Sequence, residues 1–212
     1  MRERGKTLGV GIVNKWKDQF KKPEGFLGSI AGTLMATVGT EKNEWTISLL
    51  DVKKDDNVLE IGFGPGIGIQ FVSEIVHEGK MIGVDISEKM LRQAQKRNKD
   101  AIRKGQVELL LADVFHLPTF SLLFDKVYSI NSIMFWEEPV ETLKRIRSIM
   151  KENGVIAITV QPFMKGATEE TVKKIGIEIA EQLIDAGYSD IQIERKQMKP
   201  IAAVCVLGVN RR

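Results

Sequence analysis

The chain has 212 residues, of which 43% are hydrophobic and 28% are charged, and its formal net charge is only +3. This balance is typical of a globular protein with a core and excludes a wholly disordered chain. The small net charge argues against a nucleic-acid-binding role, and because no run of about 18 apolar residues is present, we expect no membrane-spanning helix.

Basic residues gather at the start of the chain. Residues 1–22 contain seven Lys and Arg residues against two acids, Glu3 and Asp18. A solvated terminus is the simplest interpretation. The alternative is a helix on a membrane surface, with an apolar stripe formed by Leu8, Ile12, Val13, Trp16 and Phe20. Glycines interrupt this stretch and no cleavage pattern follows it, so we expect no signal peptide.

Residues 23–50 mix glycines with apolar side chains, as in GFLGSIAGTLMATVG. Each Gly weakens a helix by roughly 1 kcal/mol relative to Ala, and we therefore expect a small helical cap that is either closely packed or able to move. The predicted organisation is an N-terminal helical arm and cap over residues 1–50, followed by a main domain over residues 51–212.

From residue 55 onward, short β-branched runs alternate with longer amphipathic stretches. Strands are predicted at Asn57–Ile61, Lys80–Val84, Gln106–Leu111, Phe124–Ile130, Gly154–Val160, Ile191–Gln197 and Ile201–Val209. Helices are predicted at Gly66–His77, Ser87–Arg103, Val140–Lys151 and Glu169–Ala186, with Ser87 as an N-cap and Gly187 as a left-handed stop. The alternation predicts an α/β fold with a doubly wound, seven-stranded, mostly parallel sheet, which is a Rossmann-like arrangement.

The end of the chain departs from this alternation. Only Met198-Lys199-Pro200 separates the last two predicted strands. Three residues are too few for a parallel crossover, so these strands should form an antiparallel hairpin. Cys205, the single cysteine, lies in this apolar run, and we expect a buried thiol in a protein of a reducing compartment, the cytoplasm by default.

The stretch VLEIGFGPGIG, residues 58–68, joins the first strand to the first helix of the main domain. Gly62, Gly64 and Gly66 leave bare backbone that can lie against a ligand. The dinucleotide fingerprint G-x-G-x-x-G fails in every register of this stretch, so an NAD-dependent dehydrogenase is disfavoured. Glu60, two residues before the first glycine, would suit a ligand that carries an amino group.

These residues resemble the class I S-adenosylmethionine-dependent methyltransferases, whose first motif is an acid, one residue and G-x-G-x-G. The resemblance covers residues 55–209, because Asp85 in GVDIS, Asp113 in LLADVFHLP, and the strand and helix that follow also match the family in order. Residues 1–54 are similar to small bacterial members with a Gly-rich N-terminal cap. The resemblance implies S-adenosylmethionine as cofactor, S-adenosylhomocysteine as product, and methyl transfer as the activity.

The resemblance also implies roles for individual residues. Asp85 would bind the two ribose hydroxyls, which a carboxylate can accept side by side, and Glu60 would face the α-ammonium of the methionine part. Asp113 would meet the adenine amine, with Ile86 and Met90 flanking the ring. The predicted cofactor-binding set is Glu60, Gly62, Gly64, Gly66, Asp85, Ile86, Met90, Asp113, Val114 and Asn131.

The sequence identifies no catalytic residue and no metal site. Because the sulfonium carries an already activated methyl group, a general base is optional, and His116, Asn131 and Trp136 are only weak candidates. We expect transfer to a small-molecule acceptor at O, N or C by in-line displacement, with Met35, Asn43 and Trp45 as candidate cap contacts. The alternatives are a cofactor-binding protein without transfer activity and a lipid-directed methyltransferase at a membrane surface. The sequence does not indicate an oligomeric state.

Overall fold

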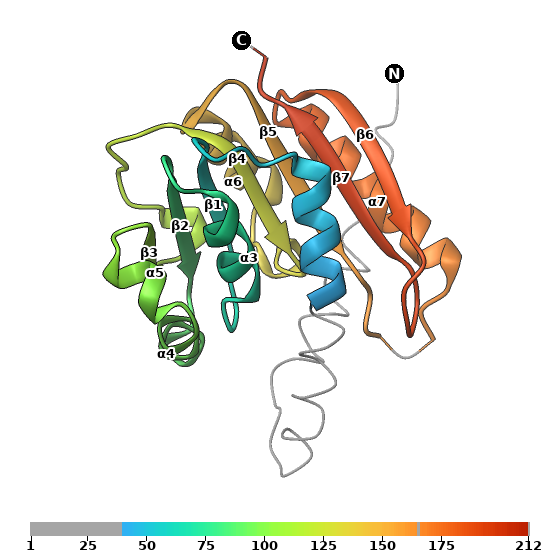
Figure 1. Ribbon diagram of the computed structural model, residues 1–212. Coiled ribbons are helices and arrows are strands. Elements are labelled where there is room, and N and C mark those ends of the chain that lie inside the picture. The colour runs from blue at the N-terminus through green and yellow to red at the C-terminus, as the bar shows by residue number, and fades with distance from the viewer. Residues whose placement is uncertain (1–39, 165, 212) are drawn as a thin grey trace.

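The computed structural model describes residues 40–164 and 166–211. Seven strands form one sheet in the order β3-β2-β1-β4-β5-β7-β6 (Figure 1). The strands are β1 (Asn57–Ile61), β2 (Lys80–Asp85), β3 (Val107–Leu111), β4 (Phe124–Ile130), β5 (Met150–Val160), β6 (Ser189–Lys196) and β7 (Ala203–Val209). Strands β1 to β5 pair in parallel, whereas β7 pairs antiparallel with β5 and β6. The predicted sheet, including its C-terminal hairpin, is confirmed.

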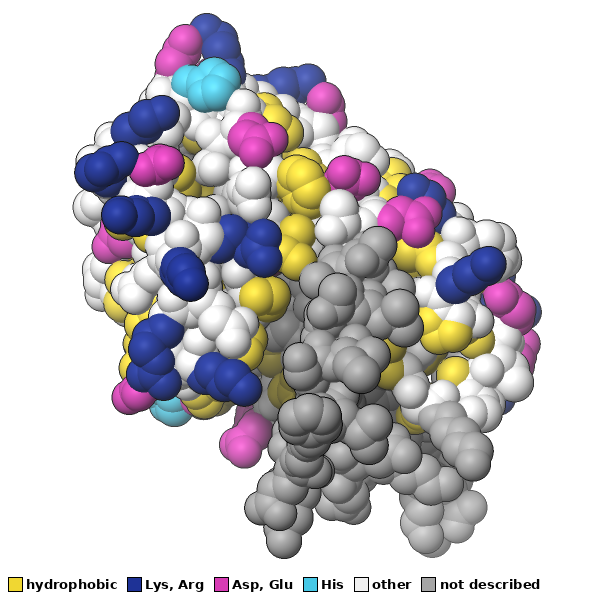
Figure 2. Space-filling view, turned by 60° about the horizontal axis from the view of Figure 1, so that its bottom comes forward, with side chains coloured by type: hydrophobic (Ala, Val, Ile, Leu, Met, Phe, Trp, Pro, Cys, Tyr) yellow, Lys and Arg dark blue, Asp and Glu magenta, His cyan; other side chains and the backbone are white. Residues whose placement is uncertain are grey.

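Helices cover both faces of the sheet (Figure 1). They are α3 (Ile67–Ile75), α4 (Glu88–Arg97), α5 (Lys99–Arg103), α6 (Pro139–Ser148) and α7 (Glu169–Asp185), and residues 40–50 are also helical. Helices α6 and α7 pack on one face, and the 40–50 helix packs with α3 and α4 on the other. Lys and Arg side chains gather on the left of Figure 2, the side on which α4 and α5 lie in Figure 1.

Neighbouring residues of a strand supply the two halves of the core. In β1, Leu59 and Ile61 contact the cluster under α6 and α7, whereas Val58 joins the opposite cluster. This alternation is the two-residue period of a strand that is buried on both faces. Cys205 of β7 is fully buried, and burial raises the pKa of its thiol to about 12, as expected for a structural cysteine.

Residues 40–50, the part of the predicted cap that the structure describes, pack on this core. Ile47 and Leu50 of the 40–50 helix are buried. The Thr46 hydroxyl lies 2.7 Å from that of Thr159 in β5. Residues 1–39, which include the basic arm, Met35 and most of the predicted cap, lie outside the described residues. A domain boundary at residue 50 stays a prediction.

The predicted helix Ser87–Arg103 is wrong in one respect, because the structure divides it into α4 and α5. Ser87 is the N-cap of α4, as predicted, and its hydroxyl accepts the Met90 N–H at 3.4 Å. The division falls at Asn98, whose φ of −102° and ψ of 21° are not helical. The buried Asn98 amide donates to backbone carbonyls instead, a competition that makes Asn a weak helix former.

The boundary between α6 and β5 also differs from the prediction. Helix α6 ends at Ser148 rather than Lys151, and β5 starts at Met150. Met150 is fully buried and pairs with Phe124, and an irregularity in the ladder follows before regular pairing resumes. The helix C-terminus at Gly187 is as predicted, since Gly187 has a φ of +90° directly after α7 and its C-cap.

Candidate active site

The strand order reverses between β1 and β4, which are adjacent although the chain leaves them in opposite directions. From β1 the chain continues through α3 to β2, and from β4 through α6 to β5. Helices α3 and α6 lie on opposite faces of the sheet, so their connections separate and leave a crevice at the carboxyl ends of the strands. In open α/β sheets, ligands bind at this point.

The glycine loop follows β1 at this edge of the sheet, and its first residue, Gly62, lies against the crevice. Gly62, Gly64 and Gly66 have φ values of +75°, +53° and +79°, all in the left-handed region that disfavours side chains. The Gly62 N–H donates to the Val84 carbonyl at 2.8 Å, and the Gly66 N–H donates to that of Phe63 at 3.0 Å. The three glycines are therefore needed for the backbone path itself.

Asp85, the last residue of β2, is held by the backbone on both sides. Its Oδ2 accepts the Gly64 N–H and its Oδ1 accepts the Ser87 N–H, each at 2.8 Å. A carboxylate offers about four acceptor positions, so both oxygens keep acceptor capacity for hydroxyl groups. The side chain is 9% exposed. The Gly64 and Ser87 N–H groups thus fix the orientation of the predicted ribose acid.

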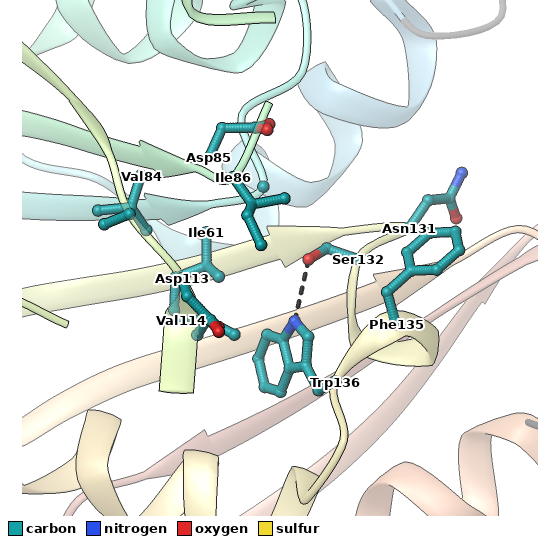
Figure 3. Close-up of a pocket in the computed structure, with 12 residues that line it drawn as sticks. Ile61, Val84, Asp85, Ile86, Asp113, Val114, Asn131, Ser132, Phe135 and Trp136 are labelled. Carbon is teal, nitrogen blue, oxygen red and sulfur yellow. Dashed lines mark hydrogen bonds between the residues drawn. The ribbon is translucent and has the colours of Figure 1, made fainter. Parts of the chain in front are cut away.

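A crevice with a volume of ≈ 290 Å³ lies beside these groups (Figure 3). Its lining residues come from the ends of β1, β2, β3 and β4 and the loops that follow them: Ile61, Gly62, Val84, Asp85, Ile86, Ala112, Asp113, Val114, Asn131, Ser132, Phe135 and Trp136. The structure therefore brings together six predicted cofactor-binding residues, namely Gly62, Asp85, Ile86, Asp113, Val114 and Asn131, and the candidate Trp136.

Asp113 begins the short 3-10 helix η1 (Val114–His116) after β3. Its Oδ1 accepts the Phe115 N–H at 2.9 Å, and the residue also lines the crevice. The imidazole of His116 is not among the crevice lining, and its side chain is 75% exposed, 3.6 Å from Asp113 Oδ2. The structure therefore places His116 next to the crevice but not in it.

Beyond β4, the chain forms the opposite wall through η2 (Ile133–Phe135). Asn131 has a φ of +54°, and its Oδ1 accepts the Gln161 N–H at 2.8 Å. The Trp136 indole N–H donates to Ser132 Oγ at 3.0 Å, the contact drawn in Figure 3. The indole is thereby fixed in one orientation at the crevice.

Glu60 lies behind the glycine loop, not in the crevice. It is 2% exposed, and its Oε2 accepts the Tyr128 O–H at 2.9 Å. Its Oε1 and the oxygen atoms of Asn43 and Tyr128 lie within 2.7 Å of the point that a side chain on Gly68 would occupy. A contact between Glu60 and the methionine part of the cofactor stays a prediction.

Burial raises the pKa of Glu60 to about 8, partly opposed by the hydrogen bond from Tyr128 and by the Ile69 N–H. The raised value means that the folded protein holds a proton on Glu60 which the unfolded chain loses near pH 4.5. Between these values the unfolded state binds fewer protons, so stability falls as pH rises, by at most about 1.4 kcal/mol per pH unit.

The variant Glu60→Gln tests this behaviour because the glutamine side chain at position 60 does not titrate. Its free energy of unfolding should lose this pH-dependent term between pH 5 and pH 8, and above pH 8 it should exceed that of the native protein. Urea denaturation at a series of pH values measures the free energy of unfolding of both proteins. The other titrating groups are the same in the two proteins, so their contributions cancel in the difference. Parallel pH profiles would show that Glu60 is already ionised in the folded protein.

Three more predicted cofactor-binding residues, Gly64, Gly66 and Met90, lie outside the crevice lining, and their contacts with the cofactor stay predictions. Met90 is not among the crevice lining and packs against the buried cluster under α3 and α4. Tyr128, which donates to Glu60, and Arg97 and Asn98, which donate to carbonyls of the glycine loop, have no role predicted from the sequence. An Asn within a charged helical stretch was the available signal for Asn98, whereas Tyr128 looked like any core residue of a strand.

Two classes of site are not found in the described part of the chain. Residues 40–164 and 166–211 contain no group of three or more His, Cys, Asp or Glu side chains that could hold a metal ion. No helix within the same ranges has the length and apolar character needed to cross a membrane.

The sheet order and the crevice define an α/β protein of the nucleoside-cofactor-binding class. Residues 58–154 match a family model described as a methyltransferase domain. The relative named uncharacterized methyltransferase YdaC, from Bacillus subtilis (strain 168), is 35% identical over 176 residues, covering 83% of this chain and 95% of the relative. The chain belongs to the methyltransferase family.

Solved structures of the same fold agree with this assignment. A SAM-dependent methyltransferase from Aquifex aeolicus has a TM-score of 0.64 at 20% identity, covering 82% of this chain and 97% of that one. Phosphoethanolamine N-methyltransferase 2 from Haemonchus contortus, in complex with S-adenosyl-L-methionine, has a TM-score of 0.65 at 17% identity, covering 81% and 53%. These likenesses show that the chain shares the fold of both proteins.

Proposed function

We propose that this enzyme transfers the methyl group of S-adenosylmethionine to a small-molecule acceptor at O, N or C by in-line displacement. The observation that supports this most directly is the anchoring of Asp85, whose two oxygens are fixed by the glycine loop and by Ser87 while facing a crevice of nucleoside size. A vicinal diol is the ligand group that matches such a carboxylate.

The crevice residues fit the rest of the nucleoside. Ile86 is 74% exposed beside Asp85, an apolar surface that a bound ring would cover. Asp113 and Val114 lie at the end of β3, where the carboxylate can accept from an exocyclic amine. Asn131 and Gly62 line the side toward β1 and β4, so we place the methionine part of the cofactor along the glycine loop.

When bound, the cofactor supplies a methyl group on a positively charged sulfur, which is already a good leaving group. The protein then has to orient the acceptor atom opposite the sulfur and exclude water. We propose Phe135 and Trp136 as the acceptor wall, because both line the crevice and Phe135 is 45% exposed. Asn131, which also lines it, is a candidate for contacting the acceptor.

The proposal is tested by binding and by turnover. Calorimetric titration should give saturable binding of S-adenosylmethionine and none of NADH, which serves as the negative control. Incubation of the enzyme and cofactor with fractions of a small-metabolite pool should release S-adenosylhomocysteine in an acceptor-dependent manner, measured by mass spectrometry. Binding without release from any fraction would instead favour a cofactor-binding protein. Release only with added lipid vesicles would overturn the small-molecule acceptor.

A cytoplasmic location stays a prediction from the sequence. Cys205 is a free, buried cysteine, which agrees with this prediction.

A further inference from the structure

Helix α4 is linked to Asp85 at its N-terminal end and to the glycine loop at its C-terminal end. At its N-terminus, Ser87 caps the helix and donates its backbone N–H to Asp85. At its C-terminus, the consecutive residues Arg97 and Asn98 reach the glycine loop from outside the crevice. The helix is thus placed to couple the ribose acid to the loop.

Asn98 holds the last glycine of the loop. Its Nδ2 donates to the Gly66 carbonyl at 3.0 Å and to that of Ala94 at 2.9 Å, and the residue is 4% exposed. A side chain on Gly66 would meet Asn98 Nδ2 at 2.6 Å and Ala94 Cβ at 2.7 Å. The loop and the end of α4 are therefore in direct van der Waals contact as well as hydrogen-bonded.

Arg97 binds Pro65, the residue that precedes Gly66 in the loop. Its Nε donates to the Pro65 carbonyl at 3.0 Å, and its Nη1 donates to Gln70 Oε1 in α3 at 3.4 Å. Two neighbouring side chains of α4 thus bind two neighbouring carbonyls of the loop. With the Gly64 N–H on Asp85, the contacts close a ring that runs from the loop through Asp85 and α4 back to the loop.

We propose that Arg97 and Asn98 are positioning residues for the cofactor, which act by fixing the glycine loop in its binding conformation. The inference rests on the proposed placement of the cofactor along this loop. Three alternating glycines make a loop that could adopt many conformations, and ordering it at the time of binding would reduce affinity. Contacts that order it beforehand raise affinity without touching the ligand.

The sharpest test compares Arg97→Ala with Arg92→Ala. Both arginines lie exposed on α4 and both changes remove one positive charge, but Arg92 contacts Glu88 of its own helix and not the loop. We expect Arg97→Ala to raise the Kd for S-adenosylmethionine by about threefold to tenfold, and Arg92→Ala to leave it unchanged within twofold. The kcat at saturating cofactor should be equal in both.

Asn98→Ala provides a second variant with a larger expected effect of about tenfold or more in Kd, measured well below its melting temperature. Hydrogen exchange should show faster exchange of the loop amides in the folded variant. An unchanged Kd in Arg97→Ala, or equal losses in Arg97→Ala and Arg92→Ala, would overturn the proposal. Absence of cofactor binding by the native protein would instead overturn the proposed function.

Discussion

The variant Asp85→Ala should bind S-adenosylmethionine at least about 100-fold more weakly than the native enzyme. Hydrogen bonds to a charged acceptor contribute about 1.5 to 3 kcal/mol each, and two ribose hydroxyls would lose theirs. The change also leaves the Gly64 and Ser87 N–H groups without their carboxylate partner, which loosens the glycine loop. Calorimetric titration with S-adenosylmethionine and with S-adenosylhomocysteine measures the loss for both ligands.

Asp100→Ala is the matched control for this prediction. Asp100 is an exposed acid of α5 whose carboxylate contacts Arg103 on the same helix. Its removal changes the net charge by the same amount but touches no residue of the crevice, so the Kd should stay within twofold. If Asp85→Ala bound both ligands as well as the control does, another residue would have to hold the ribose, and the placement of the nucleoside would be wrong.

The arrangement of the strands was predictable because a buried parallel sheet leaves a strong pattern. The β-branched runs around Val58 and Val84 are buried on both faces, and each ends in a Gly or Asp at the same edge of the sheet. From this pattern, the position of Asp85 beside the glycine loop followed from topology alone. The hairpin followed as simply, from a connection too short for any other pairing.

Side-chain directions were less predictable, because they depend on packing between segments distant in sequence. The strand period turns the Glu60 side chain to the face covered by α3, where it meets Tyr128 of β4, a partner that the sequence does not indicate. Its contact with the cofactor stays a prediction. Met90 is half-buried against the cluster under α3 and α4, and its contact with the adenine ring stays a prediction. The break at Asn98 depended on a carbonyl that lies 32 residues away in the sequence.

Arg97 and Asn98, which support the loop, could not be predicted for the same reason, because their contacts join segments distant in sequence. Arg97 looked like one more cation of a basic helical stretch, and only the fold shows that it alone among the α4 arginines reaches Pro65. The sequence of a binding loop thus predicts which residues contact the ligand. Arg97 and Asn98, which hold the loop, can be recognised only from the structure, because it shows where α4 packs against the loop.

Replacing Gly66 by Ala should cost about 2 to 5 kcal/mol of folding free energy. The φ of +79° costs roughly 1 to 2 kcal/mol for a residue with a side chain. The added methyl group would also lie 2.9 Å from Ala94 Cα and 2.6 Å from Asn98 Nδ2, and such overpacking typically costs about 1 to 3 kcal/mol. Urea denaturation measures the sum.

Two other glycines separate the effects of backbone strain, overpacking and ligand contact. Gly105, in the turn before β3, has a φ of +73°, and Gly64 has one of +53°; a side chain on either would meet no atom within 4 Å. Gly105→Ala and Gly64→Ala should therefore cost similar stability, roughly 1 to 2 kcal/mol. Only Gly64→Ala should weaken cofactor binding, by about tenfold or more, because its methyl group would occupy space along the loop where we place the ligand.

The three alanine variants together decide whether the loop is held as the structure indicates. Equal stabilities of Gly66→Ala and Gly105→Ala would mean that α4 moves away without cost, which contradicts a rigid contact between Gly66, Ala94 and Asn98. Native cofactor affinity in Gly64→Ala would mean that the ligand does not lie against the loop. Loss of stability in the first comparison and loss of affinity in the second would show that one short glycine loop meets two separate demands, close packing against α4 on one side and close approach of the cofactor on the other.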